Sequence, residues 1–166
     1  MNVAPDMLAA VFRRAATQEF ATSAHWSLLA NHIAEDRELL EIAAVTQPGH
    51  FPPYLLLAAV HQLVLKGEAA ELDAYYPSVG GTQSPNGDLW LAFRASALRH
   101  RDRLAEVIAR RHVNKTVLRR CACLRPLVIE AARRLEADRV HLVDIGCSAG
   151  LNLLLDQWGV LYGPGR

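Results

Sequence analysis

One stretch of the sequence predicts a β-strand, and it limits the folds that the chain can adopt. Residues 140–145 are mostly apolar and rich in β-branched side chains, and a turn with two glycines follows them. Beyond the turn, apolar residues recur at helical spacing up to Trp158. The pattern predicts a strand, a turn and a helix. Because a parallel sheet needs further strands and none follow, we expect the chain to hold only the first part of such a domain.

The turn after the expected strand has the features of an anion site. Backbone N–H groups at a helix N-terminus favour a carboxylate or a phosphate. Gly146 permits a backbone conformation closed to other residues, and Gly150 lets a ligand approach closely. The spacing Asp-x-Gly-x-Ser-x-Gly resembles the first motif of S-adenosylmethionine-dependent methyltransferases and does not fit the dinucleotide pattern Gly-x-Gly-x-x-Gly. A purely structural turn remains the alternative.

The methyltransferase resemblance implies a cofactor site. The N–H groups of the turn would receive the amino-acid end of S-adenosylmethionine, with Asp144 ordering the turn and Ser148 adding a hydroxyl. The candidate cofactor-binding residues all lie within residues 144–152: Asp144, Gly146, Cys147, Ser148, Ala149, Gly150 and Asn152. The sequence identifies no catalytic residue.

The rest of the sequence predicts helices, at least five of them before residue 137. They are expected at about 5–20, 23–34, 36–45, 52–65, 68–76, 88–111 and 116–135, with Ser23, Asp36 and Asp88 as caps. The fourth is apolar on every side, so it is expected at the centre of the core. The expected fold class is mainly α: a multi-helix domain over 1–137, followed over 138–166 by the first strand-turn-helix of a truncated Rossmann-like α/β domain. Residues 78–87 are either a connector or a loop over a site.

The charges are divided unequally along the chain. Residues 1–83 contain 4 Lys and Arg against 9 Asp and Glu, and residues 84–166 contain 14 against 8. We expect the acidic first half to pack against the basic helices of residues 94–139. A nucleic-acid surface is the alternative, but no aromatic residues lie among the basic positions to stack on bases, so nucleic acid is not an expected partner.

Composition excludes several classes of protein. Asp6 interrupts what would be a signal peptide, and the most apolar window, residues 54–65, contains His61 and Gln62 and is too short to span a bilayer. We therefore expect a cytoplasmic protein without membrane contact. The three cysteines and seven histidines have no metal-binding spacing, so no metal is expected.

Three motifs resemble a bacterial family known as domain of unknown function 2332, over nearly the whole chain. They are residues 55–61, 76–81 and, most specifically, 144–152. Members of this family are longer and resemble methyltransferases in their second half. The resemblance implies that Asn114, with Arg119 or Arg120, lines the cofactor cleft, although His112 and Val113 depart from the family pattern.

Two functions are consistent with these observations. The first is a fragment of a methyltransferase-like protein that binds S-adenosylmethionine, with little activity alone. The acid that holds the ribose would follow the turn by roughly 20 residues, and that count reaches the end of the chain. The second is a helical binding module whose glycine turn is structural and which has no catalytic activity. The oligomeric state and the methyl acceptor stay open.

Overall fold

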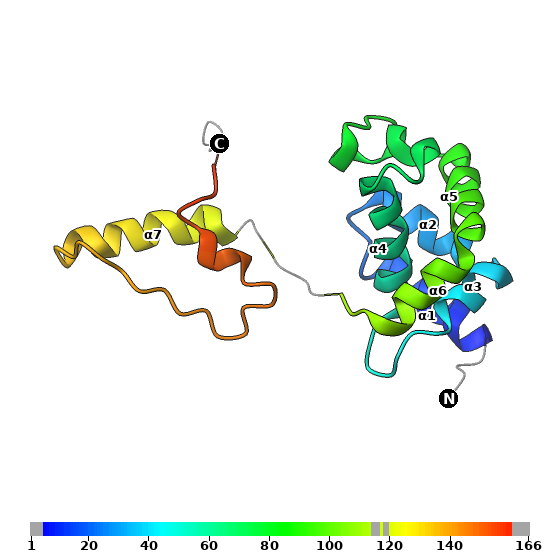
Figure 1. Ribbon diagram of the computed structural model, residues 1–166, viewed down its shortest axis with the longest axis horizontal. Helices are drawn as coiled ribbons and strands as arrows, with labels where there is room; N and C mark the ends of the chain where they lie inside the picture. Colours follow the sequence, from blue (N-terminus) through cyan, green and yellow to red (C-terminus); the bar gives the residue numbers. More distant parts are fainter. Residues whose placement is uncertain (1–4, 114–116, 118–119, 161–166) are drawn as a thin grey trace. The chain divides into compact units, whose positions relative to one another are not determined.

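The computed structural model describes residues 5–113, 117 and 120–160, and all regular secondary structure within these ranges is helical (Figure 1). The chain divides into two compact units, Met1–Val113 (unit 1) and Asn114–Arg166 (unit 2). The domain boundary expected near residue 137 therefore lies within unit 2. The expected mainly α content is confirmed.

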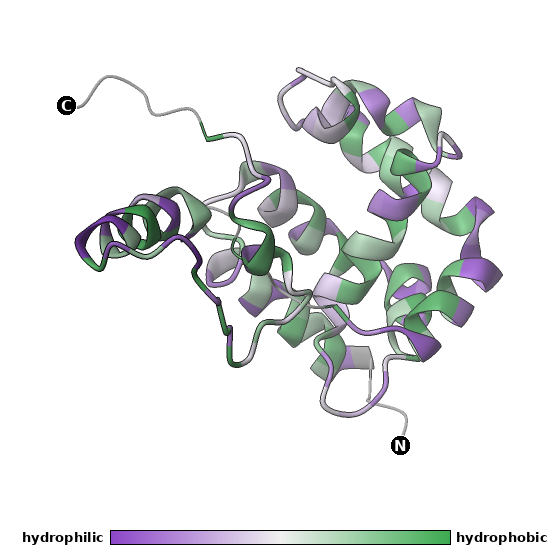
Figure 2. Ribbon diagram, turned by 60° about the vertical axis from the view of Figure 1, so that its left-hand side comes forward, coloured by the Kyte–Doolittle hydropathy of each residue, from purple (hydrophilic) through white to green (hydrophobic). Residues whose placement is uncertain are grey.

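Unit 1 is built from α-helices of 7 to 14 residues and shorter 3-10 helices, joined by short connections. They are α1 (Pro5–Thr17), α2 (Ala24–Ile33), α3 (Arg37–Ala43), α4 (Pro52–Leu65), the 3-10 helices η1 (Ala70–Tyr75) and η2 (Pro77–Val79), α5 (Gly87–Arg99) and α6 (Arg101–Arg110). Both apolar and polar residues occur on most of these helices (Figure 2). No helix in the described part of the chain is long and apolar enough to cross a membrane.

Side-chain oxygens start three of the helices. Ser23 and Asp36 cap α2 and α3, as the sequence predicts, and each accepts a hydrogen bond from the N–H three residues later, at 3.3 and 3.0 Å. At α5 the capping oxygen belongs to Asn86, at 3.1 Å, rather than to the expected Asp88. Each cap satisfies an N–H group that the helix leaves unpaired, and this stabilises the helix by about 1 kcal/mol.

Helix α4 lies in the core of unit 1, as its apolar sequence predicts. Its buried residues are Pro53, Leu55, Leu56, Leu57, Ala59, Val60, Leu63 and Val64. Gly67, with φ +70°, follows its end in the left-handed conformation that commonly ends a helix. The burial is not complete, however, because Ala58, Gln62 and Leu65 form an exposed stripe. This stripe gives α4 one face that is open to solvent.

The long helix expected over residues 88–111 is two helices in the structure. Helix α5 ends at Arg99, and His100 has a ψ of 18° before α6 begins at Arg101. This ψ lies outside the α-helical range near −42°. The break does not disturb the apolar pattern, because Leu104 and Ile108 are buried as expected. The periodicity alone therefore could not reveal it.

The acidic and basic halves of the sequence meet within unit 1. The ion pairs that join them are Arg94–Asp36, Arg94–Glu38, Arg99–Glu71, Arg101–Glu41 and Arg103–Glu68. The expected packing of acidic residues against basic helices is thus confirmed for α5 and α6. In unit 2, Arg133 and Arg134 pair instead with Glu130 on their own helix.

Unit 2 contains α7 (Arg120–Arg134) and the 3-10 helix η3 (Leu151–Leu154) among its described residues. The strand expected at residues 140–145 is not formed, and Figure 1 draws this orange segment without an arrow. A strand requires a neighbouring strand that takes up its N–H and C=O groups, and the described residues of unit 2 supply none. The expected Rossmann-like strand-turn-helix is therefore wrong, and the helix expected after the turn is only η3.

Unit 2 buries few apolar side chains. Cys121 and Leu155 are its only buried hydrophobic residues within the described ranges, whereas Val143 is 81% exposed and Ile145 is 94% exposed. Helix α7 also contains Pro126, which cannot donate a backbone hydrogen bond. Residues 140–145 and α7 therefore lack the close packing found in unit 1.

Candidate functional site

The expected cofactor turn, residues 144–152, lies in unit 2 and leads into η3. Gly146, Ser148 and Gly150 have φ values of +76°, +54° and +72°, all in the left-handed region. The N–H of Gly150 donates a hydrogen bond of 2.8 Å to the carbonyl of Cys147. A Cβ atom added to Gly146 would meet nothing within 4 Å, so the backbone angle and not close packing favours glycine there.

The side chains of the turn differ in their surroundings. Ser148 and Ala149 are exposed, whereas Asp144 and Cys147 are partly buried. Asn152 is 7% exposed. Its Oδ1 accepts a hydrogen bond of 3.4 Å from Cys121 Sγ on α7. Asn152 therefore holds η3 to α7.

The expected cleft residues are described only in part. Arg120 begins α7 and is exposed, whereas Asn114 and Arg119 lie outside the described residues. Their proximity to the turn stays a prediction. The cofactor role of the turn residues likewise stays a prediction.

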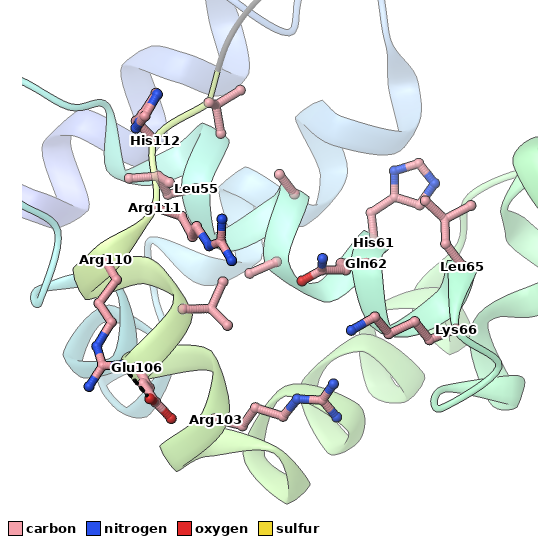
Figure 3. Close-up of a pocket in the computed structure, with 14 residues that line it drawn as sticks. Leu55, His61, Gln62, Leu65, Lys66, Arg103, Glu106, Arg110, Arg111 and His112 are labelled. Carbon is pink, nitrogen blue, oxygen red and sulfur yellow. Dashed lines mark ion pairs between the residues drawn. The ribbon is translucent and has the colours of Figure 1, made fainter.

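A groove of about 700 Å³ runs between α4 and α6 of unit 1, along the open stripe of α4. This α4–α6 groove is lined by Leu55, Ala58, Ala59, His61, Gln62, Leu65, Lys66, Arg103, Glu106, Val107, Arg110, Arg111, His112 and Val113. Figure 3 shows Gln62, Lys66 and Arg111 pointing into the space between the two helices. The volume is in the range of small-molecule sites.

The groove carries a net positive charge because two of the four Lys and Arg side chains that line it have no carboxylate partner among the described residues. Arg103 forms an ion pair with Glu68, and Arg110 pairs with a glutamate one turn earlier on α6 at 3.0 Å. Within the described ranges, no ion pair involves Lys66 or Arg111. Two uncompensated cations facing one space attract an anion.

A second hollow of about 340 Å³ adjoins the groove. It is lined by Glu19, Phe20, Thr22, Ser23, Trp26, Tyr54, Leu57, Ala58, His61 and Val113, and we call it the aromatic hollow. Ala58, His61 and Val113 line both spaces. The open face of α4 thus has a cationic space on one side and an aromatic space on the other.

Beside the aromatic hollow, five side chains form the His61 cluster: His25, Trp26, His61, Tyr76 and Ser78. The ring centre of Tyr76 lies 5.0 Å from that of His61 and 4.7 Å from that of His25, and Trp26 lies 6.2 Å from His61. His61 Nε2 and Ser78 Oγ are hydrogen-bonded at 2.7 Å. The cluster joins residues of α2, α4 and the η1–η2 region.

Burial keeps the ionisable members of the His61 cluster neutral. It lowers the pKa of His25, which the neighbouring His61 lowers further, and it lowers the pKa of His61 itself. Burial raises the pKa of the Tyr76 hydroxyl. The buried atoms His25 Nε2 and Tyr76 Oη have no hydrogen-bond partner in the described structure. A neutral imidazole beside a hydroxyl can accept its proton.

The sequence alone did not predict a site at the groove or at the His61 cluster. Two features of the sequence could have indicated this site. His61 and Gln62 interrupt an otherwise apolar helix, and the motif at residues 76–81 contains Tyr76 and Ser78. The pairing pattern that leaves Lys66 and Arg111 free of carboxylates has no sequence signal, because it depends on contacts between distant segments.

The residues that the structure describes contain no group of three or more His, Cys, Asp or Glu side chains that could hold a metal ion.

The fold and the two features of α4 define a helical protein with a cationic groove beside an aromatic and histidine cluster. The chain belongs to the family described as "Uncharacterized protein conserved in bacteria (DUF2332)", whose model matches residues 9–166. The expected family is thus confirmed. No curated protein and no solved structure matches the chain.

Proposed function

We propose that unit 1 is a binding module for a small organic anion, which it holds in the α4–α6 groove. The observation that carries the proposal is that Lys66 and Arg111 point into the same space and have no carboxylate partner in the described part of the chain (Figure 3). Gln62 adds an amide donor beside them. Charge-assisted hydrogen bonds from two cations and one amide favour a carboxylate or a phosphate.

The aromatic hollow gives the ligand a second requirement. It lies beside the groove and presents Phe20, Trp26 and Tyr54. Apolar surface that a ligand buries against such rings adds about 25 cal/mol for each Å². The best ligand therefore combines an anionic group for the groove with a flat apolar group for the hollow.

Calorimetric titration with phenyl phosphate tests this proposal, and phenol serves as the uncharged analogue. We expect phenyl phosphate to bind more tightly than phenol. Lys66→Gln or Arg111→Gln should weaken its binding about ten- to a hundredfold, because each removes a charge-assisted hydrogen bond of about 1.5–3 kcal/mol.

Arg14→Gln is the matched control, because it removes one positive charge from an exposed position on α1 that does not line the groove. Its affinity for phenyl phosphate should equal that of the unchanged chain. Equal binding of phenyl phosphate and phenol, or an equal loss in all three variants, would contradict an anion site at the groove.

A second candidate function is S-adenosylmethionine binding at residues 144–152, as expected of a methyltransferase-like protein. It is supported by the left-handed φ values of Gly146, Ser148 and Gly150, since turns with such residues can direct successive N–H groups at an anion. The carboxylate of S-adenosylmethionine is such an anion. Binding at this turn would not depend on the α4–α6 groove.

Titration with S-adenosylmethionine tests the second candidate. Gly146→Val and Gly150→Val should abolish binding, because a β-branched residue tolerates a left-handed φ poorly. Gly159→Val is the control, since Gly159 has no such φ and a Cβ there meets nothing within 4 Å. The absence of any heat with the unchanged chain would remove this candidate.

A further inference from the structure

We propose that Ser78 and His61 form a nucleophile and general-base pair that hydrolyses carboxylic esters. Ser78 Oγ lies 2.7 Å from His61 Nε2, within the distance over which a base takes the proton of an attacking hydroxyl. Ser78 is exposed, so an ester carbonyl can reach its oxygen. This activity goes beyond anion binding and does not depend on it.

The surroundings of His61 hold its ring in place. In hydrolases a third group commonly orients the base. Here the rings of Tyr76 and Trp26 lie beside the His61 ring, with centres 5.0 and 6.2 Å away. The lowered pKa of His61 leaves the imidazole unprotonated at neutral pH, the state that a general base requires.

The aromatic hollow identifies the class of ester. His61 lines this hollow together with Phe20, Tyr54 and Leu57. An acyl group placed there lies beside the base and is surrounded by apolar side chains. The geometry therefore points to esters with a small apolar or aromatic acyl group.

The reaction needs only water besides the ester. Ser78 Oγ bonds to the carbonyl carbon while its proton passes to His61 Nε2. The carbon–oxygen bond to the leaving alcohol then breaks, and His61 returns the proton to that alcohol. Water then gives one proton to His61 and bonds to the acyl carbon. The bond between that carbon and Ser78 Oγ breaks, His61 returns the proton to Oγ, and the carboxylic acid leaves.

Incubation of the full chain with p-nitrophenyl acetate tests the proposal through two measurements: the release of p-nitrophenolate, and an acetyl group on the Ser78 peptide by mass spectrometry. Ser78→Ala should remove both, apart from the slow reaction of the other side chains. Ser84→Ala, which removes another exposed serine six residues after Ser78, is the matched control and should keep both.

His61→Ala should lower the acylation rate about a hundredfold or more, the size expected for loss of a general base. Added imidazole should restore the rate in this variant and should not do so in Ser78→Ala. The rate in the unchanged chain should fall with decreasing pH as His61 becomes protonated. Absence of acetyl on Ser78, or acetylation that is equally fast in His61→Ala, would overturn the proposal.

Discussion

Arg94 and Asp36 connect the middle of α5 to the start of α3. Arg94 Nε lies 2.6 Å from Asp36 Oδ2, while the other carboxylate oxygen, Oδ1, accepts the capping hydrogen bond of α3 at 3.0 Å. The Asp36 side chain is only 9% exposed, so water competes little for it. One carboxylate thus starts a helix and joins two segments that are 58 residues apart.

Replacing Asp36 should therefore destabilise unit 1. Asp36→Ala removes the cap and the ion pair together, and the free energy of unfolding should fall by about 1 kcal/mol or more in urea denaturation. Arg94→Ala should cost less in the Asp36→Ala background than in the unchanged chain, because one of its two partners is already gone while Glu38 remains. Arg13→Ala, which breaks an exposed pair with Glu35, is the comparison and should change little.

Unit 1 should lose stability as the pH falls below the ordinary histidine pKa of 6.5. Burial lowers the pKa of His25 and of His61, so between 6.5 and the lower folded values the unfolded chain binds more protons than the folded chain. The unfolding free energy is fully retained above 6.5 and decreases as the pH falls through this window. Urea denaturation at about pH 7.5 and about pH 5.5 measures the difference.

His25→Phe should reduce this pH dependence, because phenylalanine keeps the ring contact with Tyr76 and cannot be protonated. His141→Gln, at an exposed position of unit 2, should leave it unchanged. Equal stability of the unchanged chain at both pH values would contradict the role of the buried histidines.

Gly81 should be the least replaceable glycine of unit 1. A Cβ atom there would lie 2.2 Å from the carbonyl oxygen of Asp73 and 2.7 Å from the backbone of Ala74. Because backbone atoms cannot move aside cheaply, Gly81→Ala should destabilise unit 1 by about 3 kcal/mol. Thermal unfolding followed by circular dichroism measures the loss.

Gly87→Ala is the matched substitution, since a Cβ at this position meets nothing within 4 Å. It should be neutral or stabilise the chain by about 0.5 kcal/mol. Equal melting temperatures for the two variants would show that the close contact at Gly81 relaxes at no cost.

Oligonucleotides should bind weakly, and moderate salt should abolish the binding. The α5 and α6 arginines that pair with acidic residues of the first half leave few positive charges to neutralise phosphates. Fluorescence anisotropy with a labelled duplex measures the affinity. Glu41→Gln should raise it by releasing Arg101, whereas tight binding of the unchanged chain in high salt would refute the prediction.

The parts of the fold that the sequence predicts well are those fixed by local contacts. Ser23 and Asp36 cap helices through N–H groups three residues away, so residue type and spacing suffice to place them. The segment at 140–145 has an equally clear local pattern, yet a strand depends on a partner elsewhere in the chain. Strand propensity without a partner strand leaves residues 140–145 outside any sheet.

The candidate site depends even more on distant contacts. Arg103 and Arg111 are both arginines near α6, and only the pairing of Arg103 with Glu68 makes them different. Likewise, Ser78 becomes notable only when its hydrogen bond to His61 is known. Neither relationship follows from the order of residues along the chain.

The exposed apolar side chains of residues 140–145 are expected to shorten the lifetime of the protein in a cell. Val143 and Ile145 combine exposed β-branched side chains with backbone groups that no strand in the described ranges pairs with. Stretches of this kind are bound by chaperones, cut by proteases and paired edge to edge in aggregates. We therefore expect the less well-packed unit 2 to limit the yield and the lifetime of the chain, although the buried hydrophobic cluster of the described residues lies in unit 1.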